Sequence, residues 1–408
     1  MKILHTSDWH LGKKLGEFSR LDEQKEVMDE IVSIAETYKV DAVLVAGDLF
    51  DTFIPSSEAT DLFFRTIKRL TGNGVRPVIA IAGNHDSPDR IEAPAPLAKE
   101  CGIIFAGQPD YMAPDIDMDT GIKTLNCEPG VIELKLPNND YPLRIVSTAY
   151  ANEFRLKKFL GVENSEENLR QSLEDKWREV ADKYCDDKGI NILLSHLFFM
   201  KKGSEKPKEP ENEKPIDFVG GAQAIFSSSI PAQMQYVALG HLHRLHEIDS
   251  LPCPVVYSGS PLAYSFSEAE QDKYVIIIKA EPGKSINYEK VKLEKGRKLF
   301  RKEFNSVREA VEWLDDNNNI LVELTIVTEN YLSVNDQKAL YKANDGIISI
   351  APKLLNNNNP KDDEEFVNAK EIEINELFSK YFLSSKGVEP NDEIMELFKE
   401  ILSEQDKS

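Results

Sequence analysis

Long apolar runs are missing from this chain of 408 residues: none approaches the roughly 20 residues that a membrane-spanning helix needs. The first residues, Met1-Lys2-Ile3-Leu4-His5, lead directly into a strand pattern and carry no signal-peptide cleavage pattern. We therefore expect a cytoplasmic protein that has no membrane partner.

Cysteine is scarce, and its positions are far apart with no CxxC pair: Cys101, Cys127, Cys185 and Cys253. In a reducing compartment such residues act as small, partly buried hydrophobic side chains rather than as metal ligands. The sequence also lacks the GxxxxGK[ST] glycine loop that cradles nucleotide phosphates, so ATP hydrolysis is not expected of this chain.

Positive charge is also short, because 49 Lys and Arg stand against 70 Asp and Glu, a net charge of −21. This balance argues against a general electrostatic attraction to nucleic acid. It does not exclude a nuclease, since divalent ions bound to carboxylates reverse the local field. The hydrophobic share of 41% is that of an ordinary globular protein, and the length predicts two or three domains.

The most informative stretch is Gly83-Asn84-His85-Asp86, which closes the apolar run 78–82. An amide, an imidazole and a carboxylate in succession at the end of a strand favour chemistry over packing. Four further apolar runs end in polar residues of the same kind: 3–7 before Asp8-Trp9-His10, 42–46 before Gly47-Asp48, 192–195 before His196, and 236–240 before His241-Leu242-His243.

The first part of the chain alternates strand and helix patterns. Apolar stripes at helical spacing predict helices over 20–38 and 56–70, with a short helical piece after Pro88. Together with the apolar runs, this is the βαβ rhythm of an α/β sheet, in which the loops gather at the carboxyl ends of the strands.

The next part predicts a hairpin over 131–136 and 143–148, helices over 153–160 and 165–184, and a strand that ends at His196. The strand that ends at His241 and the strands over 255–258 and 274–280 are expected to form the second sheet of a layered core. The segment 201–215 is rich in Lys, Glu and Pro and predicts a loop.

A second, small α/β domain is expected to begin near Gly296. Ser306 and Glu309 form a capping-box pair at the start of a helix. The expected order is strand 298–304, helix to about 314, strand 321–327, helix 333–342 and strand 347–350. The resulting domains are 1–295, 296–355 and 356–408.

The last segment, 361–408, follows an asparagine-rich linker at 356–360 and has fourteen Asp and Glu against six Lys. Its two amphipathic helix patterns either dock on the rest of the chain or form a helical hairpin that grips a partner's helices or coiled coil, and we favour the second. The apolar residues expected at that contact are Leu377, Phe378, Phe382, Leu397, Phe398 and Ile401.

The polar residues at the strand ends are candidate metal ligands: Asp8, His10, Asp48, Asn84, His196, His241 and His243. Oxygen and imidazole nitrogen without thiolate suit Mn, Fe or Zn better than Ca or Mg. The set is too large for one ion and right for two, and a pair about 3.5–4 Å apart needs a bridging carboxylate. Such a pair makes water nucleophilic toward phosphorus.

Each motif taken alone has an ordinary structural explanation. A lone Asp-x-His or Gly-Asp is usually a turn, and a histidine such as His196 after an apolar run is usually a satisfied core residue. Gly-Asn-His-Asp and Gly-His-Leu-His are more specific, and their joint occurrence at strand ends favours a metal or catalytic site. His246 is left over as a surface or supporting residue.

The motif set resembles the phosphoesterase motifs of the calcineurin-like metallophosphoesterases. The matching residues are Asp8-x-His10, Gly47-Asp48, Gly83-Asn84-His85-Asp86, His196 and Gly240-His241-x-His243. The flanking residues 6–12, 46–52 and 257–261 resemble, more narrowly, its bacterial DNA nuclease branch, and the likeness extends over nearly the whole chain. The resemblance implies a sandwich of two central sheets flanked by helices, with a small α/β capping domain and a C-terminal helical pair.

The resemblance also implies roles for single residues. Asp8, His10 and His243 would hold one Mn²⁺ and Asn84, His196 and His241 the other, with Asp48 bridging. His85 would orient the phosphate and protonate or stabilise the leaving oxygen, which suits an imidazole. We add the hypothesis that Asp86 fixes His85. Archaeal and eukaryotic relatives carry a second catalytic histidine where this chain has Asp51.

The implied activity is Mn²⁺-dependent cleavage of DNA: 3′-to-5′ exonuclease on duplex ends and endonuclease on single strands or hairpins. The implied partners are DNA, an ABC-type ATPase with a long coiled coil, and a second copy of the chain. The basic run 295–302 of the capping domain is a candidate DNA contact, and the helix face near Phe63 and Phe64 a candidate dimer interface, although Phe63 is equally suited to the core.

Two other hypotheses use the same residues. A phosphoesterase for small molecules or phosphoproteins would share the metal centre but has no obvious use for a partner-gripping tail. In a non-catalytic scaffold the metals would only stabilise the fold, which the complete ligand set and the presence of His85 argue against.

Overall fold

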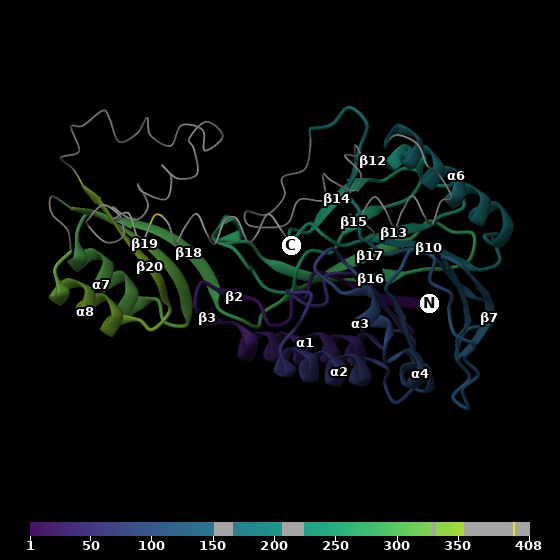
Figure 1. Ribbon diagram of the computed structural model, residues 1–408, viewed down its shortest axis with the longest axis horizontal. Coiled ribbons are helices and arrows are strands. Elements are labelled where there is room, and N and C mark those ends of the chain that lie inside the picture. Colours follow the sequence, from purple (N-terminus) through teal and green to yellow (C-terminus); the bar gives the residue numbers. More distant parts are fainter. Residues whose placement is uncertain (151–165, 206–223, 329–331, 355–394, 396–408) are drawn as a thin grey trace. The chain divides into compact units, whose positions relative to one another are not determined.

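The computed structural model describes residues 1–150, 166–205, 224–328, 332–354 and 395 (Figure 1). The chain forms two compact units, Met1–Ile326 with Leu332–Pro352 and Val327–Tyr331 with Lys353–Ser408. The second unit lies almost entirely outside the described residues, so the fold below is that of the first. Within the described part, no helix is both long and apolar enough to cross a membrane.

The first sheet has the strand order β17-β16-β1-β4-β5-β6. Its strands are β1 Lys2–Thr6, β4 Ala42–Ala46, β5 Val78–Ile81, β6 Ile103–Ala106, β16 Lys273–Lys279 and β17 Asn287–Leu293. The strands from β1 to β6 pair in parallel, whereas β16 and β17 pair antiparallel beside β1. Every residue of β4 and β5 is buried, as expected for parallel strands that are covered on both faces.

The second sheet has the order β14-β15-β13-β10-β9-β8-β7. Its strands are β7 Lys123–Glu128, β8 Val131–Lys135, β9 Leu143–Thr148, β10 Ile190–Ser195, β13 Tyr236–Leu239, β14 His246–Asp249 and β15 Val255–Tyr257. The strands β9, β10, β13 and β15 pair in parallel, and β8 and β9 form the predicted antiparallel hairpin.

Helices cover the outer face of each sheet (Figure 1). The helices α1 Leu21–Tyr38 and α2 Ser57–Leu70 pack on the first sheet, and α6 Glu166–Tyr184 packs on the second through Leu173, Trp177 and Val180. Between the two sheets lies a core of aliphatic side chains that includes Leu44 and Ile192. The α/β sandwich predicted from the sequence is therefore confirmed.

Shorter elements surround these layers. They are β2 Lys14–Leu15, β3 Phe18–Ser19, α3 Pro88–Glu92, α4 Ala95–Ala98, β11 Phe199–Met200 and β12 Ile225–Phe226. The helix α3 is the predicted piece after Pro88. It follows β5 after the Gly83-Asn84-His85-Asp86 loop, so that this loop lies between a buried strand and a helix.

The predicted small α/β region has the expected order of elements. They are β18 Lys298–Phe304, α7 Val307–Asp316, β19 Ile320–Thr328, α8 Val334–Ala343 and β20 Ile347–Leu354. The Ser306 side chain accepts from the backbone N–H of Glu309, as predicted, while the Glu309 carboxylate accepts from Asn305 N rather than from Ser306. Leu299 and Leu321 pack with Leu15 and Phe266 of the larger sandwich, and the division into three domains stays a prediction.

One strand assignment from the sequence is wrong. The run 274–280 was expected in the second sheet, but β16 pairs antiparallel with β1 in the first. A continuous apolar run indicates burial on both faces and does not say which sheet provides the partner. The free edge of β1, left open by its parallel pairing with β4, supplies that partner.

Several predictions fall outside the described residues. They are the helix 153–160, the loop residues 206–215, the linker 356–360, and the tail with Leu377, Phe378, Phe382, Leu397, Phe398 and Ile401. Of the cysteines, Cys185 and Cys253 are buried free thiols, as expected. On the predicted dimer face, Phe63 belongs to the core and Phe64 is 39% exposed.

Candidate metal centre

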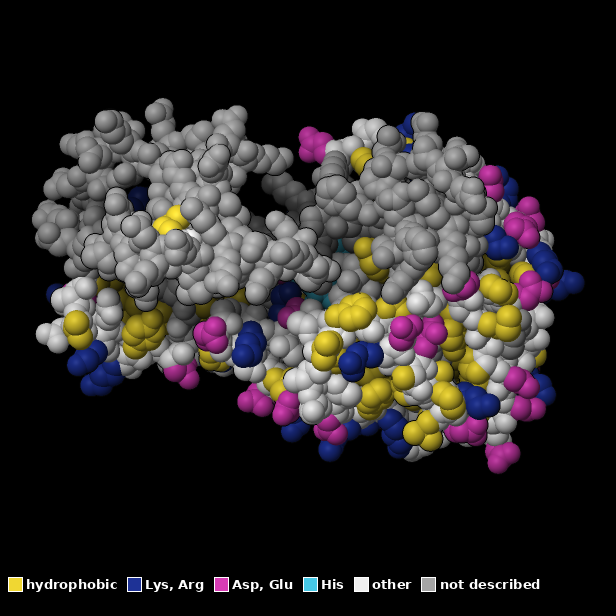
Figure 2. Space-filling view, in the orientation of Figure 1, with side chains coloured by type: hydrophobic (Ala, Val, Ile, Leu, Met, Phe, Trp, Pro, Cys, Tyr) yellow, Lys and Arg dark blue, Asp and Glu magenta, His cyan; other side chains and the backbone are white. Residues whose placement is uncertain are grey.

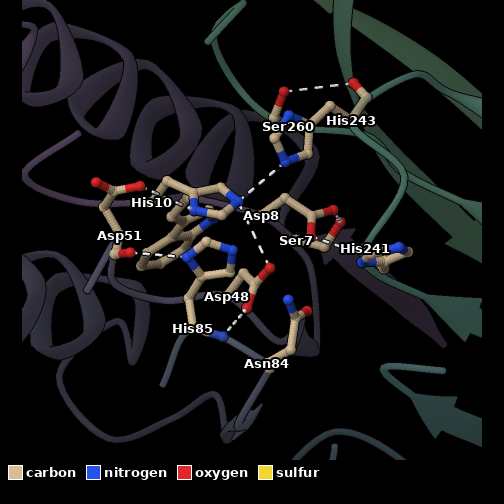
Figure 3. A network of polar contacts seen from close by, with 12 residues as sticks. Ser7, Asp8, His10, Asp48, Asp51, Asn84, His85, His241, His243 and Ser260 are labelled. Atoms are coloured by element: carbon tan, nitrogen blue, oxygen red, sulfur yellow. Dashed lines mark hydrogen bonds and ion pairs between the residues drawn. The ribbon is translucent and has the colours of Figure 1, made fainter. Parts of the chain in front are cut away.

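The candidate ligands follow five strands whose carboxyl ends point to the same region. Asp8 and His10 follow β1, Asp48 follows β4, and Asn84 follows β5 of the first sheet. His196 follows β10, and His241 and His243 follow β13, of the second sheet. Because parallel strands end at a common edge, the loops of both sheets meet there. Figure 3 shows six of these side chains gathered around one space: Asp8, His10, Asp48, Asn84, His241 and His243.

The side chains fall into two buried groups, each able to offer ligand atoms within 4.8 Å of one another: Asp8 with His10 and His243, and Asp48 with His196 and His241. His10 Nε2 lies 2.9 Å from His243 Nε2, and His196 Nε2 lies 2.9 Å from Asn84 Oδ1. Two ligand atoms bound at about 2.1 Å and at right angles to one ion lie about 3 Å apart. These spacings fit metal binding.

Asp48 belongs to the second group and also faces the first. Its Oδ2 is 3.5 Å from His10 Nε2 and 3.4 Å from His196 Nε2, so that one carboxylate oxygen faces a histidine of each group. Its other oxygen, Oδ1, accepts a hydrogen bond of 2.9 Å from the backbone N–H of His85. A carboxylate in this position can be shared by two ions.

The backbone at the ligands adopts conformations that side chains normally avoid. Asp8, His10, Asp48 and His241 have φ of 53°, 42°, 49° and 111°. Non-glycine residues with positive φ are uncommon, and the surrounding structure must hold them in place. Here Asp8 N donates to Gly47 O at 2.9 Å, and His241 N donates to Asp8 Oδ1 at 2.7 Å. Strain of this kind, concentrated on ligands, indicates a functional site.

Close approach explains the glycines in the motifs. A Cβ on Gly83 would lie 2.2 Å from the backbone nitrogen and Oδ1 of Asp48. A Cβ on Gly47, which has φ of +88°, would lie 2.3 Å from His196 Nδ1. The loops can converge on the ligands only because neither position carries a side chain.

The electrostatics of the site favour a bound cation. Burial raises the pKa of Asp8 to about 7, despite the opposing effect of His196 and His243. Burial would also raise the pKa of Asp48, but His196 and His10 hold it well below its usual range. For His196, burial acts to lower the pKa, and the charges of Asp48 and Asp8 outweigh it, giving a pKa of about 9. Divalent cations would neutralise these two carboxylates, so the residues fit a metal centre.

His85 lies beside the ligands and is held by the backbone. Its Nδ1 donates to the Asp51 carbonyl oxygen at 2.7 Å, and its ring centroid lies 4.8 Å from that of His10 (Figure 3). The Asp51 carboxylate lies 2.8 Å from Lys13 Nζ and 3.6 Å from His10 Nδ1. Asp51 thus supports His85 through its main chain.

Asp86 acts differently from the prediction that it fixes the His85 ring. Its carboxylate accepts backbone N–H groups of Gly83, Leu49 and Phe50 at 2.8–3.0 Å. These bonds join the loop after β5 to the loop after β4. Asp86 therefore positions the two loops, and His85 with them, through the backbone.

A family model described as calcineurin-like phosphoesterase matches residues 1–245. The SbcD subunit of the SbcCD nuclease of Bacillus subtilis is 36% identical to this chain, over 99% of this chain and 98% of the relative. The chain belongs to the SbcD family of calcineurin-like phosphoesterases.

Other members of the SbcD family are more distant. The Staphylococcus epidermidis protein of the same name is 30% identical over 73% of this chain and 71% of its own length. The Escherichia coli K12 protein is 28% identical over 81% of this chain and 79% of its own. The solved structure of a dimetal phosphatase from Danio rerio aligns with 72% of this chain and 99% of its own length, at 12% identity and a TM-score of 0.38.

In this SbcD-family chain the structure adds residues that the sequence did not single out. His243 Nδ1 lies 3.1 Å from Glu268 Oε1, and the other oxygen of Glu268 pairs with Lys273 Nζ. Lys273 also donates to the His243 carbonyl oxygen and to Ser260 Oγ. In the sequence, only the neighbouring 257–261 motif indicated that this region belongs to the site. Glu268 and Lys273 stand alone, outside any motif, so the sequence did not identify them as supporting residues.

Proposed function

We propose that this chain is a Mn²⁺-dependent DNA nuclease subunit that works with an ABC-type ATPase of the SbcC kind. The activity would be 3′-to-5′ exonuclease on duplex ends and endonuclease on single strands or hairpins, in DNA end processing, repair and recombination. One observation carries the proposal: two groups of buried ligands meet at Asp48, directly beside His85. The SbcD relatives, which are named as parts of the SbcCD nuclease, support DNA as the substrate.

One ion would be held by Asp8, His10 and His243 and the other by Asn84, His196 and His241, with Asp48 shared. When bound, such a pair supplies Lewis-acid polarisation of the phosphate and lowers the pKa of water. The chain itself holds the ligands in place before any metal binds. It does so through the hydrogen bonds of Asp8 N and His241 N and through the close approach of the loops at Gly47 and Gly83. This preorganisation excludes the loose geometry in which metal sites lose activity.

His85 would give a proton to the leaving oxygen. Because its Nδ1–H donates to the Asp51 carbonyl, its Nε2 is the atom that carries a transferable proton in the protonated ring. Imidazole suits this step, since its ordinary pKa lies near physiological pH. The hydrogen bond from His85 N to Asp48 ties the proton donor to the shared ligand.

The SbcC-type partner would bind the tail after Pro360 through the apolar residues predicted there, and the nuclease would form a homodimer within that complex. The small α/β region at 296–355 would cap the metal centre and guide DNA. Arg297 is one residue of its basic run that already has contacts: it packs on the Phe18 ring and bonds Glu23. Lys298 and Arg301 pair at the surface with Asp272 at 3.8 Å and Glu323 at 2.8 Å. DNA phosphates would replace these exposed carboxylates, and Lys295 is the third candidate.

To test this, the purified protein is incubated with Mn²⁺ and one of two substrates. The substrates are linear end-labelled duplex DNA and bis(p-nitrophenyl) phosphate. Mn²⁺-dependent 3′-to-5′ shortening of the duplex supports a nuclease, and hydrolysis of the small diester alone indicates a small-molecule phosphoesterase. Failure on both substrates, with two ions bound by elemental analysis, would leave only the scaffold hypothesis.

His85→Ala is the matched variant, expected to keep its bound metal and lose roughly 10²–10⁴-fold in cleavage, the usual range for a proton donor. Unchanged cleavage would remove the proton-donor role. Deleting the residues after Pro360 should abolish co-purification with the ATPase and leave metal content unchanged.

A further inference from the structure

Two large apolar side chains are exposed next to the metal centre. Phe53 is 52% exposed and Ile54 is 71% exposed, and they are adjacent in the loop between β4 and α2. In the same stretch Leu49 and Phe50 are buried in the core. Two polar residues, Asp51 and Thr52, thus separate a buried apolar pair from an exposed one. On the face drawn in Figure 2, hydrophobic side chains lie interspersed with charged ones.

This loop is continuous with the reacting region. Asp51, whose carbonyl accepts from His85 Nδ1 and whose carboxylate faces His10, is two residues before Phe53. Two residues span at most about 7 Å of backbone, so Phe53 stands at the margin of the site. A nucleotide attached to a phosphate at the ligands would therefore lie within reach of this loop.

The loop has its own fixed geometry. Its first residue, Asp51, donates its N–H to Leu11 O at 3.3 Å, and Thr52 Oγ1 donates to Ile54 O at 3.0 Å. It ends at Ser56, whose side chain accepts from Ala59 N and caps α2. The exposed pair is thus presented from a bent segment that is anchored at both ends.

We propose that Phe53 and Ile54 form an apolar platform against which the base next to the scissile phosphate packs; this rests on the proposed function. Cations can hold the phosphate, and the base beside it can pack on an apolar or aromatic surface. Stacking of a base on an aromatic ring is worth about 1–3 kcal/mol and tolerates any sequence, which suits a nuclease that degrades DNA without sequence preference. A negatively charged chain also has reason to hold DNA ends by stacking rather than by a wide basic surface.

The test compares single variants of the full chain on two substrates. Phe53→Ala and Ile54→Ala should lower kcat/KM on duplex DNA, Phe53→Ala by about 5- to 150-fold from the stacking range. Both should leave kcat/KM unchanged on a duplex of the same length with abasic nucleotides at its 3′ ends, because the nucleotide beside the scissile phosphate then has no base to stack. Phe53→Trp, which keeps an aromatic face, should retain cleavage of the duplex.

Leu251→Ala is the matched control. Leu251 is 72% exposed, close to the value of Ile54, but lies before β15 at the opposite edge of the sheet from the ligands. Leu251→Ala should leave kcat/KM unchanged on both substrates. All of these side chains are exposed, so their loss should leave the melting temperature within a few degrees of the parent protein.

Three results would overturn the proposal. Equal loss on both substrates would mean that the loop only supports the metal centre. No loss on the duplex would mean that no base packs there. A shift from dimer to monomer in light scattering, or loss of ATPase co-purification, would assign the pair to a protein partner. If the parent protein fails to cleave DNA at all, it is the proposed function that fails.

Discussion

The two ligand groups are held in place in different ways. In the group of Asp8, the Nδ1 of His243 faces the buried carboxylate of Glu268, which is itself paired with Lys273. In the group of Asp48, the Nδ1 of His196 lies 2.7 Å from the Ala46 carbonyl oxygen, a neutral backbone group. Both contacts orient Nε2 of the histidine toward the other candidate ligands. Only His243 has a charged group, the Glu268 carboxylate, beside its Nδ1.

Because of this difference, metal affinity at the group of Asp8 should depend on the side chain of Glu268. Metal affinity at the group of Asp48 should depend on the backbone geometry at Ala46. A carboxylate behind a ligating histidine raises the basicity of the ring and fixes its orientation. A main-chain carbonyl fixes orientation without adding charge, and no substitution removes it. The two ions should therefore differ in how their affinity responds to mutation.

The largest effect is expected where the groups meet. Asp48→Ala removes the carboxylate that faces both His10 and His196, and should release both ions together. The loss of affinity should exceed the roughly 10–100-fold that follows removal of a supporting partner behind a ligand. Titration with Mn²⁺ monitored by calorimetry measures it, and a variant that still binds one ion with parent affinity would show that Asp48 is not shared.

The second largest effect is expected from a substitution that disturbs the backbone of the ligand loops. Gly83→Ala places a Cβ 2.2 Å from the backbone and carboxylate of Asp48, so that the loops must separate. We expect a destabilisation of about 1–3 kcal/mol, typical of overpacking, together with weaker binding of both ions. Gly203→Ala, where no atom lies within 4 Å of the added Cβ but φ is +83°, measures the cost of strained backbone without a clash, and it should leave metal affinity unchanged in the same titration and unfolding experiments.

Glu268→Gln should weaken metal binding at one ligand group and not at the other. It removes the charge behind His243 while leaving a polar side chain of the same shape, so the ion held with Asp8 should bind about 10–100-fold more weakly. The ion held with His196 should keep its affinity. Two-site titration of metal distinguishes the cases, and equal weakening of both ions would contradict a local role for Glu268.

A second substitution, at Lys273, provides the control for Glu268. The single variant leaves the buried Lys273 ammonium without its carboxylate, which costs about 3–5 kcal/mol in typical buried pairs. Glu268→Gln combined with Lys273→Met should recover much of that stability and keep the weak metal binding. Recovery of both would show that the effect on metal was only a consequence of unfolding.

The smallest effect is expected at Asp51. Its carboxylate lies 3.6 Å from His10 Nδ1, beyond a normal hydrogen bond, and its contact with His85 is made by the backbone carbonyl. Asp51→Ala should therefore reduce cleavage by less than about tenfold, well below His85→Ala. A loss as large as that of His85→Ala would mean that the carboxylate takes part in the reaction.

The sequence was sufficient for features that depend on neighbouring residues. Helical spacing located α1 and α2 to within one residue, and apolar runs located β4 and β13. The seven ligands were identifiable because each follows such a run. The structure brings all of them to one edge, although their roles in holding particular ions stay predictions.

What needed the structure were contacts between distant parts of the chain. The place of β16 beside β1 depends on an open sheet edge, and the contact of Glu268 with His243 joins residues in separate loops. Asp86 bonds backbone of two loops instead of the His85 ring because those N–H groups are buried and need an acceptor.

The sequence by itself determined which residue types stand at the ends of the strands, because strand and helix periodicities are set by local covalent geometry. Only the tertiary structure decided that Asp48 faces both groups, that the backbone at the ligands is strained, and that Phe53 and Ile54 stay exposed beside them. These depend on how two sheets pack against each other, and packing is a property of the whole fold.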